Sequence, residues 1–379
     1  MKQTETLIVG ASMAGMAVAA VLQKFGREYC IIEKQAAVGS PWRRHYKRLH
    51  LHTNKRVSHL PYKKFDGNIP RYPSRQEVIA YLEAYQQAFN IHPIFNTEVI
   101  STRHEAGHWI SETEKESVKS KYLVMATGAF GQPRPVNFPG MDSFPGMIMH
   151  SCAYKTGEDF RGKRVLVVGF GNSAGEIAID LFEQGAIPSL SVRSPVNIIP
   201  RDILGIPILE VSQFLSHLPP RLADRLSAPF IRLVLGDITK LGLRRKSIGP
   251  FQQIKQEGKI PVLDIGTIKH IRQRHIQVCA GIDRINGNTI RFTNETEAPF
   301  DAIIACIGYD RNVVNILEES EARIEDLKNR TSKQMYFGKQ GLYFCGFWIA
   351  PTGQIREIAL DAHKIGRDIM RRESGRRAG

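Results

Sequence analysis

Two glycine-rich turns constrain this chain more than any other feature, because each lies between a short apolar run and a stretch with helical periodicity. In the first, Thr6–Val9 leads into Gly10-Ala11-Ser12-Met13-Ala14-Gly15, and apolar residues then recur at helical spacing. Tyr29–Ile32 has the composition of a second buried strand and ends at Glu33. The order strand, glycine turn, helix, strand predicts a βαβ unit with parallel strands.

The same order occurs a second time. Val165–Val168 leads into Gly169-Phe170-Gly171-Asn172-Ser173-Ala174, a helical stretch follows, and Leu190–Val192 closes the unit. A chain of 379 residues is too long for one core, and strands are predicted on both sides of the second turn. We therefore predict an α/β fold of two interleaved Rossmann-like domains. Their expected bounds are 1–155 with 295–379 for the first, which is discontinuous, and 156–294 for the second.

Other segments have clear local patterns. Ser74 is a good N-cap for a helix over Arg75–Phe89, and Asn286-Gly287-Asn288 predicts a hairpin. Residues 204–242 predict two or three amphipathic helices, broken at two prolines. We interpret them as a cover packed on the sheets rather than a membrane-surface helix, because their polar faces carry mixed charge. A final helix is expected to end near Met370, before a disordered charged tail.

Composition excludes several classes of protein. No apolar stretch approaches the roughly 20 residues that span a bilayer, and the start lacks a leader pattern, so we expect a soluble, cytoplasmic protein. The five cysteines contain no Cys-x-x-Cys pair and no metal-like spacing. The net charge is +15, yet no nucleic-acid-binding motif is present. The basic run Arg43–Arg56 is either a solvated loop or a wall near cofactor phosphates. Monomer and homodimer both remain open.

The first turn has the features of an FAD site. Gly10 permits a tight turn, Gly15 allows the helix to pack closely on the strand, and the helix N-terminus offers amide donors to a pyrophosphate. Ser12 replaces the usual middle glycine. Glu33 can accept hydrogen bonds from a ribose and repels a 2′-phosphate, which favours FAD or NAD over NADP.

The second turn has the features of an NADPH site. Gly169 and Gly171 keep both leading glycines, and Arg193-Ser194 stands where the first unit has its acid. A guanidinium pairs well with a 2′-phosphate, which predicts NADPH rather than NADH; the alternative is that Arg193 is a solvated surface residue. One chain with both cofactors can pass a hydride from one to the other. Without a cysteine pair to reduce, oxygen is the favoured electron acceptor.

The chain resembles the class B flavin monooxygenases. Phe144, Gly146, His150 and Tyr154 match the family signature F-x-G-x-x-x-H-x-x-x-[YF], just before the second turn. The YUCCA branch, which converts indole-3-pyruvate to indole-3-acetate, is most similar, on segments that include Tyr72-Pro73-Ser74-Arg75, Ser247-Ile248-Gly249-Pro250 and Pro261-Val262-Leu263-Asp264-Ile265-Gly266.

The resemblance implies that NADPH reduces FAD, that O2 adds to give a C4a-(hydro)peroxyflavin, and that an aromatic 2-oxo acid such as indole-3-pyruvate is then decarboxylated. N- or S-oxygenation of amines or sulfides is the alternative, and a non-catalytic redox-binding flavoprotein is a third. His52, with Asn54 nearby, occupies the place of an asparagine that supports the oxygenated flavin in many relatives. The full set of expected cofactor-binding residues is Gly10, Ser12, Gly15, Glu33, Lys34, Trp42, Thr127, Gly128, Gly169, Gly171, Asn172, Ser173, Arg193, Ser194, Gly308 and Gly346.

Overall fold

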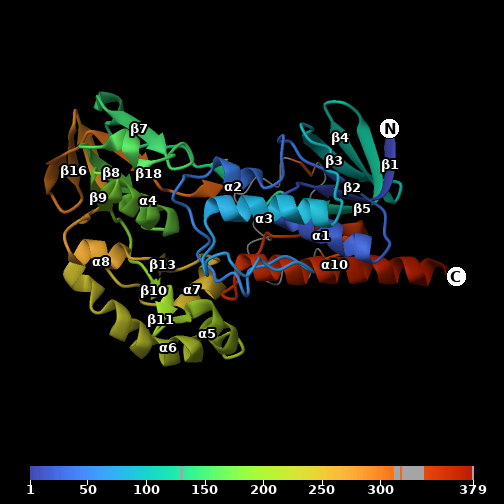
Figure 1. The fold of residues 1–379 in the computed structure, drawn as a ribbon. Helices are drawn as coiled ribbons and strands as arrows, with labels where there is room; N and C mark the ends of the chain where they lie inside the picture. Colours follow the sequence, from blue (N-terminus) through green and yellow to red (C-terminus); the bar gives the residue numbers. More distant parts are fainter. Residues whose placement is uncertain (129–130, 311–315, 318–336, 378–379) are drawn as a thin grey trace. The chain divides into compact units, whose positions relative to one another are not determined.

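The computed structural model describes residues 1–128, 131–310, 316–317 and 337–377, and the chain divides into two compact units (Figure 1). The first unit comprises Met1–Arg44, Thr53–Gln132 and Asp310–Gly379, and the second comprises His45–His52 and Pro133–Tyr309. Each unit contains a sheet with parallel strands and a glycine turn that opens a helix. The predicted fold class, α/β with two Rossmann-like units, is confirmed.

A six-stranded sheet forms the centre of the first unit, in the order β2-β1-β5-β4-β3 with β20 also paired to β5. The strands β2, β1, β5 and β20 run parallel, whereas β3, β4 and β5 form an antiparallel meander. The bounds are β1 Lys2–Val9, β2 Tyr29–Ile32, β3 Val99–Glu105, β4 His108–Thr113, β5 Ser117–Met125 and β20 Leu342–Phe344, with helices α1 Met13–Lys24, α2 Ser40–Arg44, α3 Arg75–Ala88 and α10 Gln354–Arg377, and the 3-10 turn η5 Lys339–Gly341.

Helix α1 packs against α10 in this unit (Figure 1). Side chains of α1 pack directly onto Gly366 of α10, where an added Cβ would lie 2.5 Å from a methyl carbon of Val21. Ser74 forms the predicted N-cap of α3, with a complete capping box to Glu77. Contrary to expectation, α10 continues through the charged tail to Arg377. Long-range contacts hold it there, because Glu373 accepts a 2.6 Å hydrogen bond from the Tyr122 hydroxyl.

A five-stranded, fully parallel sheet forms the centre of the second unit, in the order β14-β9-β8-β18-β7. Its bounds are β7 Met147–His150, β8 Arg164–Val168, β9 Ile187–Ser191, β14 Gln277–Cys279 and β18 Ala302–Ala305. Smaller sheets are formed by β10 Ile198–Pro200 with β13 Val262–Asp264, by the hairpin β11 Asp202–Ile203 and β12 Ile206–Pro207, and by β15 Ile282–Asn286, β16 Thr289–Phe292 and β17 Glu297–Pro299. The helices are α4 Asn172–Glu183, α5 Ile208–Leu215, α6 Pro220–Leu235, α7 Pro250–Glu257 and α8 Thr267–Arg272, with 3-10 turns η1 Met141–Ser143, η2 Gly157–Phe160 and η3 Ile238–Leu241. The two-residue strands β6 Gln132–Pro133 and β19 Tyr309–Asp310 lie where the chain passes between units.

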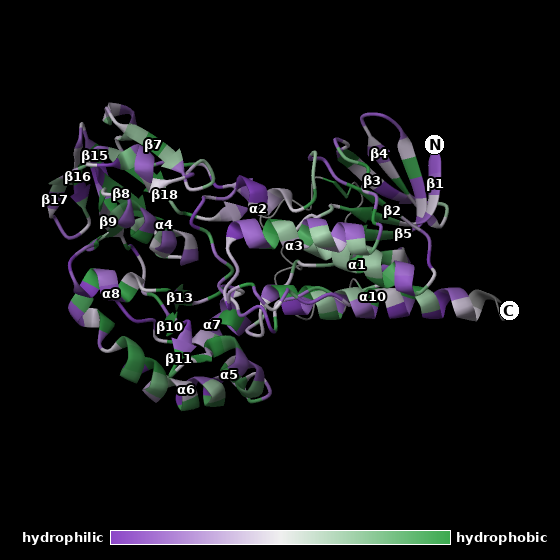
Figure 2. Cartoon of the chain, viewed as in Figure 1, coloured by the Kyte–Doolittle hydropathy of each residue, from purple (hydrophilic) through white to green (hydrophobic). Residues whose placement is uncertain are grey.

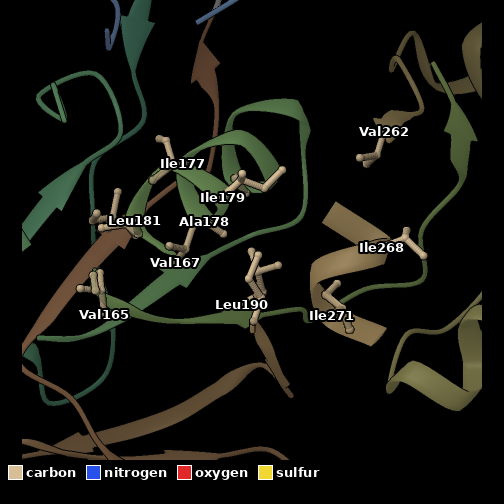
Figure 3. Packing of buried hydrophobic residues seen from close by; sticks show 14 of the residues in the cluster. Val165, Val167, Ile177, Ala178, Ile179, Leu181, Leu190, Val262, Ile268 and Ile271 are labelled. Atoms are coloured by element: carbon tan, nitrogen blue, oxygen red, sulfur yellow. The ribbon is translucent and has the colours of Figure 1, made fainter. Parts of the chain in front are cut away.

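Burial on both faces explains the continuous apolar run of β8. Val165 and Val167 pack with Ala178 of α4 and Leu190 of β9 (Figure 3), whereas Leu166 belongs to a separate cluster. A strand covered on both faces needs apolar residues at every position, as parallel strands usually show.

The bounds of the units differ from those predicted from the sequence. Residues 133–155 and 295–309 belong to the second unit, because β7 and β18 are strands of its sheet. The predicted hairpin at Gly287 is confirmed as β15–β16. The break at Pro219-Pro220 is also confirmed, since α6 begins there, but residues 202–207 form a β-hairpin before α5. Among the described residues, no helix combines the length and the apolar character needed to cross a bilayer.

Candidate functional site

The first glycine turn lies at the carboxyl ends of parallel strands. Gly10, Gly128 and Gly346 come just after β1, β5 and β20, and all three have positive φ. A Cβ on Gly10 would lie 2.8 Å from the Ala126 carbonyl oxygen, and one on Gly15 would lie 1.8 Å from the Gly10 carbonyl oxygen. Only glycine therefore lets α1 begin this close to the sheet.

The N-terminus of α1 is suited to a phosphate. Ser12 is its N-cap residue, the Ser12 side chain makes no capping hydrogen bond, and the first turn contains no acidic residue. The first N–H groups of a helix have no partners within the helix and carry the positive end of its dipole. The donor set of this turn therefore fits the pyrophosphate of FAD.

Glu33 fastens the end of β2 to this turn, a contact that the sequence did not predict. Its carboxylate accepts hydrogen bonds from the Ala11 N–H at 2.8 Å and from the Gln35 N–H at 3.0 Å, and it is buried. A carboxylate has about four acceptor positions. Capacity for ribose hydroxyls therefore remains after these two bonds.

The other expected residues of the first unit have different surroundings. The Lys34 Nζ lies 3.4 Å from Glu98 in an exposed ion pair, so its amine has a protein partner. Trp42 lies half-buried on α2, and Thr127 is exposed after β5. Asn54 is buried, and its side-chain oxygen accepts a 3.0 Å hydrogen bond from the Arg56 N–H.

The second turn also follows parallel strands. Gly169 has φ +113°, and a Cβ there would lie 2.6 Å from the Cys306 carbonyl oxygen. Gly171 is the N-cap of α4, which has no side-chain cap and no acid in its first turn. A Cβ on Gly171 would meet no atom within 4 Å. The space beside this backbone is therefore open to a phosphate group, which fits a dinucleotide at this turn.

Asn172 and Ser173 begin helix α4 directly after that glycine. The Asn172 side-chain oxygen accepts a 2.8 Å hydrogen bond from the Leu263 N–H, so it fastens β13 to the start of the helix. Ser173 is half-buried at the next position. Both side chains have partners within the second unit, since Ser173 forms a side-chain hydrogen bond with Tyr46.

Arg193 follows β9 and is exposed, as is Ser194. Within the described ranges no carboxylate pairs with the Arg193 guanidinium. Arg244 donates from Nη2 to the Arg193 carbonyl oxygen, which places a second guanidinium at the same corner. The sequence did not indicate Arg244, because it lies in another segment and no local pattern connects it with β9.

Several cations of the basic run Arg43–Arg56 have partners within the protein. Arg43 pairs with Glu83 in the first unit, and Arg48 forms two hydrogen bonds with Glu183 in the second, at 2.7 and 2.9 Å. Lys55 donates to the carbonyl oxygens of Asp66 and Gly67. Much of this positive charge is therefore bound to acidic side chains and carbonyl groups.

The signature residues hold the second unit together. Phe144 is buried in a core cluster, and a Cβ on Gly146 would lie 2.3 Å from the Asp301 carbonyl oxygen. The Tyr154 hydroxyl donates to Asp180, and burial followed by this bond raises the pKa of Tyr154. His150 accepts from the Cys152 N–H at 3.2 Å, so its Nε2 carries the proton and donates to the Gly308 carbonyl oxygen at 3.0 Å. Both His150 nitrogens thus have protein partners.

Glu176 is the most connected side chain near the second turn. It is fully buried on α4, and its Oε2 lies 2.9 Å from both the Tyr46 hydroxyl and the His52 Nε2. Its Oε1 accepts from the His50 N–H at 3.3 Å and lies 3.7 Å from Arg48. Burial and then the Glu176 charge raise the pKa of Tyr46, which stays protonated as a donor.

This cluster connects His52 to the helix of the second turn, which the sequence did not predict. Glu176 accepts from residues 46–52, so the segment that carries His52 is part of the second unit. Asn54, two residues on, belongs to the first unit. Glu176 is the last residue of the motif Gly171-Asn172-Ser173-Ala174-Gly175-Glu176, but the motif alone does not indicate which residues the Glu176 carboxylate binds.

Comparisons with known proteins agree with this arrangement. Residues 7–198 match the family model described as pyridine nucleotide-disulphide oxidoreductase. The chain is similar to indole-3-pyruvate monooxygenase YUCCA6 of Arabidopsis thaliana, at 40% identity over 97% of this chain and 90% of that protein. It is also similar to indole-3-pyruvate monooxygenase YUCCA1 of Oryza sativa subsp. japonica, at 38% identity over 94% and 91%.

Two solved structures share the fold. A flavin-containing monooxygenase from Stenotrophomonas maltophilia superposes with a TM-score of 0.70 at 18% identity, covering 98% of this chain and 99% of that chain. The open structure of cyclohexanone monooxygenase superposes with a TM-score of 0.76 at 17% identity, covering 99% and 88%. The likeness thus extends over both units of the chain.

Proposed function

Since this chain belongs to the YUCCA family of indole-3-pyruvate monooxygenases, we propose that it is an FAD- and NADPH-dependent monooxygenase that converts indole-3-pyruvate to indole-3-acetate. The observation that carries the proposal is the pair of glycine turns, one in each unit, each opening a helix without a side-chain cap or an acid in its first turn. The five cysteines contain no Cys-x-x-Cys pair of the kind that takes electrons in disulfide reductases, which supports oxygen as the acceptor.

The balance of the reaction sets the chain's task. Indole-3-pyruvate, O2, NADPH and a proton give indole-3-acetate, CO2, NADP⁺ and water. FAD, when bound and reduced, supplies the activation of O2, and the protein holds both cofactors and keeps water away from the reacting atoms. Gly10, Gly15 and the Ser12 N-cap are our proposed cradle for the FAD pyrophosphate, and Glu33 is our proposed acceptor for its ribose.

The proposed NADPH site uses the second turn. Gly169 and Gly171 bring the backbone to the pyrophosphate, and Arg193 binds the 2′-phosphate, with Arg244 beside it. For the chemistry we propose that His52 faces the reacting atoms while Glu176 fixes its ring through Nε2. A carboxylate at Nε2 requires the proton there, which leaves Nδ1 of a neutral His52 as an acceptor.

The test is product formation by the purified protein. It is mixed with FAD, NADPH, O2 and indole-3-pyruvate, and indole-3-acetate, NADPH oxidation and H2O2 are measured together. One indole-3-acetate for each NADPH, with little H2O2, is the expected result. A tertiary amine and a thioether are tested in parallel, and turnover of these without indole-3-acetate would replace the proposed substrate class. Absence of NADPH-dependent flavin bleaching would indicate a non-catalytic flavoprotein.

A further inference from the structure

Helix α6 has an exposed apolar row that its own unit does not cover. Leu222, Leu226, Phe230 and Leu233, which we call the apolar row, are 43%, 48%, 55% and 76% exposed. Their spacing of four, four and three residues puts them on one face of the helix. Eight of the sixteen large apolar side chains exposed among the described residues lie within 204–234, so exposed apolar surface is concentrated here. In Figure 2 the hydrophobic residues of α6 are coloured green along the ribbon.

The fold of the second unit does not need this row. The opposite face of α6 packs inward through Ala223, Ile231 and Leu235, and the last two belong to the unit's main core cluster. Polar residues in the apolar row would leave that packing unchanged. An apolar face of this kind, on a helix already anchored by its other face, marks an interaction surface.

The charges on α6 indicate what kind of surface it meets. Arg221, Arg225 and Arg232 are all exposed, and their spacing of four and seven residues aligns them beside the apolar row. The helix has one acidic residue, Asp224, which is buried and accepts hydrogen bonds from the Phe251 and Gln252 N–H groups at 2.8 and 3.0 Å. Every exposed charge on α6 is therefore positive. The mixed charge that led us to predict a cover packed on the sheets is absent from the exposed face of α6.

We propose that α6 docks on an anionic lipid surface, with the apolar row at the acyl boundary and the three arginines against headgroup phosphates. Apolar residues on one face and cations beside them, without exposed acids, are the pattern of helices that lie in the membrane interface. A second copy of the chain could cover the apolar row, but the same face of that copy would bring three more arginines and no exposed acid to pair with them. This docking is independent of the proposed reaction.

Vesicle flotation of the full-length protein, loaded with FAD, tests the proposal. Vesicles of phosphatidylcholine alone are compared with vesicles that contain an equal amount of phosphatidylglycerol. We expect flotation only with phosphatidylglycerol, weakened by added salt. L226E/F230E should abolish it, and R221Q/R225Q/R232Q should weaken it about fivefold for each arginine.

Two control variants match these changes elsewhere on the chain. I100E introduces a glutamate at an equally exposed apolar side chain on β3, and K2Q/K24Q/K64Q removes the same three charges from exposed lysines of the first unit. Both should float like the unchanged protein. Circular dichroism and bound-flavin absorbance show whether each variant is folded. If the apolar variant fails to fold, the arginine variant still tests the proposal, because it alters only exposed side chains.

Three outcomes would overturn the proposal. They are no flotation of the unchanged protein, flotation lost equally in the arginine and lysine variants, and flotation retained by a folded L226E/F230E. Sedimentation velocity at increasing concentration identifies the competing occupant. Self-association that L226E/F230E removes, in a protein that does not float, would assign the apolar row to a second copy of the chain.

Discussion

Replacing Glu176 by Gln removes one charge from a buried cluster with almost no change of shape. The Tyr46 hydroxyl and the His52 Nε2 both point to Oε2, while the His50 N–H points to Oε1. A glutamine has one acceptor oxygen and one NH2 group, so one of these two positions must receive a donor. With the oxygen toward Tyr46 and His52, the NH2 group faces the His50 N–H. With the amide reversed, the NH2 group faces the Tyr46 hydroxyl and the His52 Nε2–H, so donors meet donors there as well.

The expected cost is about 1.5–3 kcal/mol in the free energy of opening the second unit, the range for one hydrogen bond to a charged group. That cost corresponds to roughly 10- to 150-fold faster amide exchange in α4, where exchange requires this opening. Glu183→Gln is the matched control, because it removes the same charge from the same helix and shares Arg48. Its carboxylate is 44% exposed, so its loss should cost no more than about 1 kcal/mol.

Hydrogen exchange with mass spectrometry is the appropriate assay. All three tryptophans, Trp42, Trp109 and Trp348, belong to the first unit, so tryptophan fluorescence does not follow unfolding of the second. Peptides that cover α4 are compared among the unchanged protein and the two variants. If Glu183→Gln accelerates exchange as much as Glu176→Gln does, burial of the carboxylate does not set its contribution and the reasoning is refuted.

Three further predictions follow from the same geometry. Gly15→Ala places a methyl group against the Gly10 carbonyl oxygen and should yield protein with little bound FAD. The flavin-to-protein absorbance ratio measures this, and Gly67→Ala, where a Cβ meets nothing within 4 Å, should bind FAD normally. Arg193→Ala should raise the KM for NADPH about 10- to 150-fold with little change for NADH, and equal losses for both would disprove its contact with the 2′-phosphate. Burial raises the pKa of the Cys306 thiol to about 12. Iodoacetamide at about pH 8 should therefore label Cys306 far more slowly in the folded protein than in guanidinium, because the thiolate is the reacting form. Similar labelling rates in the two conditions would contradict this prediction.

Local patterns were enough to predict many elements of the fold. Ser74 caps α3 because its hydroxyl and the Glu77 carboxylate satisfy N–H groups only three residues away. Gly287 closes the β15–β16 hairpin because glycine adopts the positive φ that the turn requires. The buried parallel strands and both glycine turns were predictable for the same reason, since their determinants lie within a few consecutive residues.

Contacts between distant segments were not predictable. The bounds of the units, the helical tail held by Glu373, the pairing of β20 with β5 and the meeting of Arg244 with Arg193 all depend on where the chain returns after long intervals. No repeat or spacing in the sequence connects these partners.

Two strand–turn–helix units could be read from the amino-acid sequence alone, because glycine conformation, helix termini and side-chain charge act over short distances. The packed chain was needed to reveal two further features. Glu176 is a buried acceptor for residues 46–52, and Asp224 turns inward, which leaves only positive charge on the exposed face of α6. Those outcomes depend on which side chains lose their water, and burial is a property of the packed chain rather than of any one segment.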